Sequence, residues 1–304
     1  MQNSNENVGQ FLRTRIFQED IRTGELVGEL SMTENYVVNV EEERRARERR
    51  EEKSKQYYKR RSSMPFVWSV YKLSARLMDE LPGKYVAMLF YLATFDGYEG
   101  YLSTGKKPIF RKQLPKILGV TETTAYRFWK ALLKASIAAE ETEGKLSLNR
   151  EYFQIGSLVR RELAILEEQE MYLSRAYVKS IRDLYETSQP GTRNYLGHLF
   201  QILPFINREY NIVCHNPLET NLEEIRPMSF GEVCEAIGYD TENASRLLRE
   251  LLKLKFTVNG KLQGAMGYVV TSNLSDRRTY EVFINPNVLY AGSHQKEVEV
   301  LGAF

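Results

Sequence analysis

The sequence predicts a mainly helical α+β fold with small β-hairpins, in which one structural unit occurs twice. Three observations lead to this prediction: colinear matches between two parts of the chain, a helix–glycine turn–helix pattern in each part, and a strand-like segment with a glycine turn after each second helix. A chain of 304 residues has room for about two domains and additional segments.

The matches between the two parts follow one another in chain order. The clearest pairs are Tyr85 and Tyr195, Gly119 and Gly238, and Asn149 and Asn285. Their offsets of 110, 119 and 136 only increase, as loop insertions between two copies of one unit would produce. We therefore interpret residues 66–157 (copy one) and 174–293 (copy two) as a tandem duplication joined by a charged segment.

In copy two, a short helix is expected over residues 229–237, followed by a tight turn at Gly238, a residue free to adopt a positive φ. Asp240 or Thr241 then caps a second helix that extends to about Lys253. Its buried stripe is predicted to be Ala244, Leu247, Leu248 and Leu251.

Copy one repeats this layout, with a helix over residues 111–118, a turn at Gly119 and a second helix over residues 122–134. A helix-turn-helix followed by a β-hairpin is a winged helix, so the fold predicted is a pair of tandem winged helix-turn-helix domains with an N-terminal charged helical arm. The boundaries predicted are a polar arm with a charged helix at 1–63, winged-helix domain 1 at 64–158, a helical linker at 159–173, winged-helix domain 2 at 174–294 and a C-terminal tail at 295–304.

A winged helix of this kind predicts contacts to duplex DNA from the outward side chains of its second helix, which enters the major groove. Asn and Arg can read adenine and guanine, whereas Thr and Ser mostly contact phosphate. The candidates in copy two are Thr241, Asn243, Ser245, Arg246 and Arg249. Those in copy one are Thr121, Thr123, Thr124, Tyr126, Arg127 and Lys130.

The two wings differ in charge and length. The tip of wing one, residues 140–145, is acidic, whereas wing two is 17 residues longer and carries Arg277 and Arg278, which can reach a minor groove or the backbone. The other interpretation of this arginine pair is a solvated loop tip. The asymmetry predicts that copy two makes the firmer DNA contact, with copy one as a second contact or an assembly surface.

Charge is also uneven in the N-terminal arm, where residues 1–40 are polar, with one turn expected at residues 22–24. Residues 41–61 hold ten basic and six acidic residues, which favours either a solvated helical linker or a basic arm that meets phosphate. The formal charge of the whole chain is only +2, which by itself argues against nucleic-acid binding. This average conceals the basic segments, so it does not exclude DNA as a partner.

Composition argues against membrane, secreted and fibrous proteins. No apolar run reaches the length of a membrane span, residues 1–10 do not form a secretory signal, and the two cysteines, Cys214 and Cys234, suit a reducing cytoplasm. We therefore expect a cytoplasmic protein without membrane partners.

No catalytic constellation is expected. The three histidines lack metal-ligand spacing, and His198 is more typical of a satisfied histidine at the edge of a core. The segment 100–106, GYLSTGK, resembles a phosphate-binding loop but continues with Lys107 in place of Ser or Thr, so we interpret it as a chance match. The prediction is a protein that is not an enzyme and has no metal site and no cofactor.

Several motifs resemble a known family. Phe66 with Val70-Tyr71, the segment LPGK at 81–84, the helix-turn-helix and the ending INPNVLYAG at 284–292 resemble the RepL-type winged-helix replication proteins of Firmicute plasmids and phages. The ending is the most specific part, and copy one keeps it as LNREYFQIG, with Arg150 and Glu151 in place of Pro286 and Asn287. The tandem arrangement is similar in architecture to theta-type plasmid initiators.

The resemblance implies a phage or plasmid protein that binds an origin or an operator without catalysis of its own. Our leading prediction is therefore a sequence-specific double-stranded DNA-binding protein that initiates replication at origin repeats. A transcription regulator at an operator, and a winged-helix scaffold that binds only proteins, remain alternatives. Duplex DNA is the main partner expected, and a homodimer and replication or transcription proteins held by residues 1–63 are left open.

Overall fold

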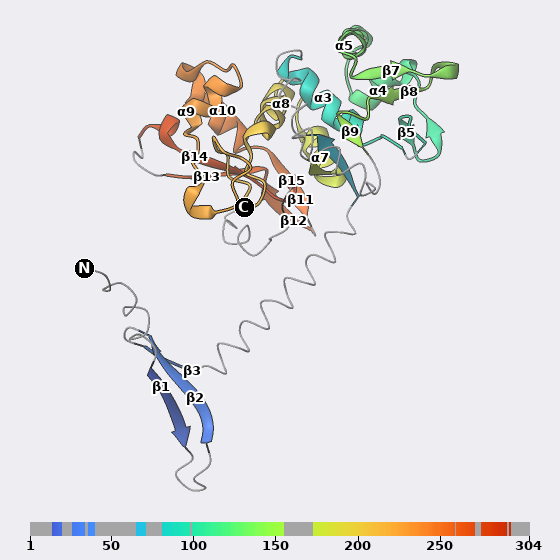
Figure 1. The fold of residues 1–304 in the computed structure, drawn as a ribbon. Coiled ribbons are helices and arrows are strands. Elements are labelled where there is room, and N and C mark those ends of the chain that lie inside the picture. Colours follow the sequence, from blue (N-terminus) through green and yellow to red (C-terminus); the bar gives the residue numbers. More distant parts are fainter. Residues whose placement is uncertain are drawn as a thin grey trace, which may run out of the picture. The chain divides into compact units, whose positions relative to one another are not determined.

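The computed structural model comprises 304 residues and describes residues 14–19, 26–33, 36–39, 65–70, 81–97, 99–154, 173–258, 260–270, 275–290 and 292. The chain divides into two compact units, residues 1–63 and residues 64–304 (Figure 1). In the first unit, β1 (Thr14–Glu19), β2 (Leu26–Thr33) and β3 (Tyr36–Asn39) form an antiparallel sheet in the order β1-β2-β3. The sequence predicted only a turn here, and the charged helix predicted within 41–61 lies outside the described residues.

Both copies contribute to one four-stranded antiparallel sheet in the second unit. Its order is β15-β10-β4-β9, where β4 is Phe66–Val70, β9 is Phe153–Gln154, β10 is Leu173–Tyr177 and β15 is Leu289–Tyr290. The two halves of the sheet have matching register: Trp68 faces Gln154 in copy one, and Arg175 faces Tyr290 in copy two. Trp68 also faces Arg175, so the two copies meet about a local two-fold axis between β4 and β10.

Two corresponding helices pack beside this axis: α3 (Gly83–Ala93) of copy one and α8 (Arg193–Gln201) of copy two (Figure 1). Phe90 stacks on its own counterpart Phe200, with ring centroids 4.2 Å apart and planes inclined by 10°. One hydrophobic cluster contains these residues and the cores of both copies. The two copies therefore share one core, and their status as separate winged-helix domains stays a prediction.

Each copy continues from this centre into helices and hairpins, which the ribbon places on either side of α3 and α8 (Figure 1). In copy one these are β5 (Ser103–Thr104), β6 (Lys107–Pro108), η1 (Arg111–Gln113), α4 (Leu114–Leu118), α5 (Glu122–Lys134), β7 (Ala138–Glu140), η2 (Thr142–Gly144) and β8 (Leu146–Leu148). In copy two they are α7 (Val178–Thr187) before α8, then η3 (Leu203–Phe205), η4 (Leu222–Glu224), α9 (Phe230–Ala236), η5 (Thr241–Asn243), α10 (Ala244–Leu251), β11 (Lys255–Val258), β12 (Lys261–Gly264), β13 (Met266–Val269), η6 (Arg277–Thr279) and β14 (Glu281–Ile284).

The turn after each hairpin is built around a corresponding asparagine. The backbone N–H of Asn149 donates to the carbonyl of Ile137, and that of Asn285 donates to Ala265. The Asn149 side-chain amide donates to Ser136, one residue before Ile137, and the Asn285 amide donates to the residue before Ala265. Each side-chain oxygen also accepts from the backbone N–H two residues later.

These contacts locate the extra residues of copy two. The offset between corresponding residues is 119 in the preceding helices and 128 between Ile137 and Ala265. The offset thus rises by nine before the hairpin β13–β14, so nine of the 17 additional residues precede this hairpin. They form the separate hairpin β11–β12. The long wing expected from the sequence is thus two hairpins, because part of the insertion pairs with itself.

Candidate nucleic-acid interface

The two helix-turn-helix segments share the same glycine turn. Gly119 ends α4 with φ 58°, and Gly238 follows α9 with φ 67°, a left-handed conformation that glycine adopts without steric strain. In copy one the N–H of Val120 donates to the carbonyl of Pro115 at 3.0 Å, and in copy two Tyr239 donates to Cys234 at 2.8 Å. The backbone turn after the first helix is therefore the same in both copies.

Helix α5 is fixed by its cap and by its apolar stripe. The Thr121 hydroxyl accepts a hydrogen bond from the N–H of Thr124, which caps the first turn. Four side chains of the helix are buried: Ala125, Phe128, Trp129 and Leu132. Burial of this stripe leaves the remaining faces of α5 toward solvent.

The candidate residues of copy one lie on those faces. Thr121, Thr123, Tyr126, Arg127 and Lys130 are exposed, and Thr124 is half-buried. Tyr126 is 50% exposed, and the guanidinium of Arg111 lies 4.8 Å from its ring centroid. A tyrosine exposed to this extent, beside a cationic side chain, can stack on a base or contact a thymine methyl group.

The start of the second helix in copy two differs from the sequence-based expectation. Asp240 does cap it, but the first turn is the 3₁₀ segment η5, and the α-helix begins only at Ala244. The side-chain amide of Asn243 donates to the Asp240 carboxylate at 2.7 Å, so this amide is engaged within the protein. Asn243 is therefore a weaker candidate for reading adenine than its sequence position indicated.

The other candidates of copy two vary in accessibility. Ser245, Arg246 and Arg249 are exposed, whereas Thr241 is half-buried. The Nε of Arg249 lies 3.5 Å from the Glu250 carboxylate. Arg246 is thus the exposed base of α10 that the structure leaves most available.

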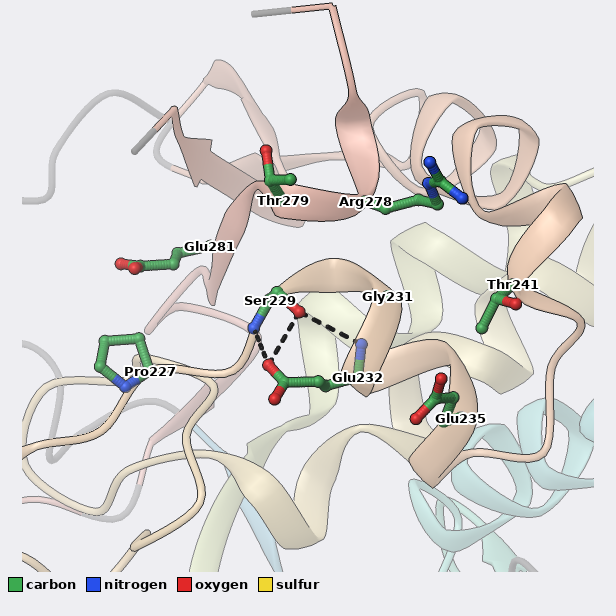
Figure 2. Close-up of a pocket in the computed structure, with 9 residues that line it drawn as sticks. All are labelled: Pro227, Ser229, Gly231, Glu232, Glu235, Thr241, Arg278, Thr279 and Glu281. Carbon is green, nitrogen blue, oxygen red and sulfur yellow. Dashed lines mark hydrogen bonds between the residues drawn. The ribbon is translucent and has the colours of Figure 1, made fainter. Parts of the chain in front are cut away.

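The arginine pair of wing two forms part of a short helix, η6, beside α9. The guanidinium of Arg278 donates three hydrogen bonds to the Asp276 carboxylate, at 2.8, 2.9 and 3.2 Å, and both arginines are exposed. Arg278 and Thr279 face the start of α9 across a pocket of about 530 Å³ (Figure 2). The sequence suggested either a basic wing that reaches DNA or a solvated loop tip, and neither interpretation placed this pair against the helix-turn-helix.

The same pocket makes this face of copy two acidic. Glu232, Glu235 and Glu281 line it, and Figure 2 shows the Glu232 carboxylate joined to Ser229 in a capping box at the start of α9. Burial raises the pKa of Glu281, whereas the hydrogen bonds from Ser229 lower the pKa of Glu232. Carboxylates at this entrance repel a phosphate backbone.

Wing one is acidic, as its sequence indicates, and its acids are held within the copy. The Trp129 indole donates to Glu140 at 2.8 Å, the Ser147 hydroxyl donates to Glu141 at 2.6 Å, and Lys145 pairs with Glu143 at 2.9 Å. Glu140 joins the hairpin to α5, Glu141 and Glu143 are paired within the hairpin, and these carboxylates offer no phosphate contact.

Comparison of corresponding residues reveals a charge contrast that the candidate set missed. Residues 111–134 of copy one hold six bases and one acid, whereas residues 230–253 of copy two, at the constant offset of 119, hold three bases and five acids. Of the four missed bases, Arg111, Lys112 and Lys116 belong to η1 and α4, and Lys134 is the last residue of α5. Counting charge over the whole repeated segment would have found them.

The residues considered for catalysis have local partners. His198 contacts Asn194 at 3.1 Å and Gln201 at 2.7 Å through its ring nitrogens, and burial lowers its pKa. The segment 100–106 lies in the β5–β6 hairpin and is followed directly by a strand, whereas a phosphate-binding loop is followed directly by a helix. Among the described residues there is no group of three metal-binding side chains.

Within the same part of the chain, no helix is both long and apolar enough to cross a membrane. Comparison with family models, with curated proteins and with solved structures gives no match to this chain.

Proposed function

We propose that this chain is a non-catalytic, sequence-specific double-stranded DNA-binding protein of a phage or plasmid, built from tandem winged helices, and that it initiates replication by binding origin repeats. One observation carries the proposal: a helix, a left-handed glycine turn, a second helix and a β-hairpin follow one another in both copies. This order is that of a DNA-binding winged helix.

The exposed surface of copy one supports DNA as the partner. Helix α5 exposes Tyr126, Arg127 and Lys130 on a segment with five net positive charges. Bases supply phosphate contacts that position a protein on duplex DNA, and the groove-facing side chains of the second helix supply sequence preference. The origin itself enters the proposal through the resemblance of the ending at 284–292 to RepL-type proteins, and residues 1–63 would recruit replication proteins.

A transcription regulator that binds an operator needs the same groove contacts. Footprinting on the replicon that encodes the protein separates the two roles. Several protected repeats near an origin support initiation, whereas one protected site beside a promoter supports regulation.

A winged-helix scaffold that binds only proteins is the candidate from another class. The acidic surface of copy two favours it, because residues 230–253 carry two net negative charges. Fluorescence anisotropy of the full chain with a labelled duplex of random sequence, titrated with salt, discriminates the two classes. We expect binding that weakens steeply with salt; absent or salt-insensitive binding would refute the DNA proposal.

A further inference from the structure

Copy one has a basic pocket beside its glycine turn. The pocket has a volume of about 610 Å³, and its cationic lining residues are Lys84 of α3, Lys116 of α4 and Arg193 of α8. Thr121 and Thr124, from the start of α5, line the same pocket. None of the described residues that line it is acidic, so it is suited to an anion next to the predicted DNA-reading helix.

Arg193 is held in place by hydrogen bonds that cross from copy two to copy one and by an aromatic ring of its own copy. Its Nη1 donates to the carbonyls of Leu118 and Gly119 at 2.7 and 3.3 Å, at the end of α4, and its guanidinium carbon lies 4.1 Å from the ring centroid of Tyr185. Lys84 and Lys116 are exposed. The pocket thus combines one fixed cation with two cations that can move to meet a ligand.

Copy two has no cation at any of the three corresponding positions. Lys84 corresponds to Asn194 at the offset of 110, and Lys116 corresponds to Glu235 at the offset of 119. Arg193 corresponds to Gly83, again at 110. The duplication therefore repeats the backbone of this region without repeating its charge.

The hollow of copy one is also filled in copy two. Val120 lines the pocket of copy one, whereas its counterpart Tyr239 packs its ring on His198, with centroids 5.1 Å apart. His198 is the counterpart of Met88, which lines the pocket of copy one. An anion can therefore approach the glycine turn closely in copy one, and the tyrosine ring occupies the equivalent space in copy two.

We propose that copy one anchors the chain on duplex DNA by receiving a backbone phosphate in the pocket of Lys84, Lys116 and Arg193, while the corresponding face of copy two makes no backbone contact of comparable strength. This inference rests on the proposed DNA binding and reverses the division of labour expected from the two wings. Wing two contributes less than expected because Arg278 is paired with Asp276 and faces an acidic pocket.

The test compares two double variants of the full chain that remove the same charge. The first variant is Lys84→Gln with Lys116→Gln, in copy one. The control is Lys253→Gln with Lys261→Gln, two exposed lysines of copy two. Affinity for a labelled random duplex is measured by anisotropy across salt concentrations of about 50 to 200 mM, and circular dichroism checks that both variants are folded.

For the copy-one variant we expect the slope of log affinity against log salt to become shallower by about 0.9, the counterion release of one phosphate, which corresponds to roughly an eightfold loss of affinity at 0.1 M salt. The control should change affinity by less than about threefold. Equal losses in the two variants, or a larger loss in the control, would overturn this inference while leaving DNA binding intact. If the wild-type chain bound no duplex at all, this result would refute the proposed DNA binding itself, independently of the two variants.

Discussion

Replacement of Gly197 by alanine should separate the two copies at their common helix pair. A Cβ at this position would lie 1.7 Å from the carbonyl oxygen of Gly83, 2.3 Å from its carbonyl carbon and 2.8 Å from its Cα. All three atoms are backbone, so no side-chain rotation relieves the clash. Since real Cβ contacts are not shorter than 3.0 Å, α3 and α8 must move apart locally by at least 1.3 Å, the difference between 3.0 and 1.7 Å.

The magnitude follows from three contributions. Overpacking of a close contact costs about 1–3 kcal/mol, and loosening of the stacked pair Phe90–Phe200 adds about 0.5–1.5 kcal/mol. Alanine in a helix interior offsets about 1 kcal/mol, because it restricts the unfolded chain more than glycine does. We therefore expect the free energy of unfolding to fall by about 2 kcal/mol, the middle of a summed range of about 0.5–3.5 kcal/mol.

Equilibrium urea unfolding, followed by circular dichroism, measures this change. The matched control is Gly191→Ala, because a Cβ at Gly191 meets no atom within 4 Å and this residue does not have a positive φ. The control should be neutral or slightly more stable than wild type. A Gly197→Ala variant as stable as the control would refute the packing of the two copies through this helix pair.

Three further predictions concern the DNA surface, pH and the repeated asparagine. Under the proposed function, Arg127→Ala with Lys130→Ala should weaken duplex binding at least several-fold more than Arg246→Ala with Arg249→Ala in an anisotropy assay; the opposite order would restore copy two as the firmer contact. Burial raises the pKa of Asp96 to about 6, so its contribution to stability is present near pH 4 and is lost as pH rises toward 6. The variant Asp96→Asn should therefore be as stable as wild type near pH 4 and about 1 kcal/mol more stable at pH 7. Unchanged stability at pH 7 would contradict this expectation. Asn285→Ala should lower the free energy of unfolding, measured by urea unfolding, by about 2–4 kcal/mol. The reason is that Asn285 is fully buried and that its amide and its side-chain oxygen both make hydrogen bonds. A loss below about 1 kcal/mol would be too small for that role.

The parts of the fold that the sequence indicated well are those fixed by local chemistry. The left-handed turns at Gly119 and Gly238 need glycine, and the buried stripe of α10 matches the predicted Ala244, Leu247, Leu248 and Leu251. The four-stranded sheet was not predicted, because β9 and β15 contain only two residues each and their pairing joins segments far apart in the chain. Strands this short carry no periodicity that a sequence could reveal.

The candidate site was predictable only in part, for a related reason. Exposure of Tyr126, Arg127 and Lys130 follows from the helical period, and the structure agrees with it. The basic pocket joins Lys84 and Lys116 to Arg193, which comes from the other copy and lies 109 residues after Lys84 and 77 after Lys116. The packing of α3 on α8 and on α4 brings these side chains together.

The backbone features that the two copies share, and the surface charge in which they differ, point to different constraints on backbone and surface. The glycine turns, the asparagine hydrogen bonds and the register of the central sheet are the same in both copies. Charge on the helix-turn-helix surface is not the same, and it differs by seven units between residues 111–134 and 230–253, from +5 to −2. A backbone that is repeated in both copies, with surface charge that is not, would place copy one on DNA and leave the acidic face of copy two available for a basic partner. Under the proposed function, that arrangement lets one chain bind DNA and a second macromolecule at the same time, as an initiator that recruits other proteins must do.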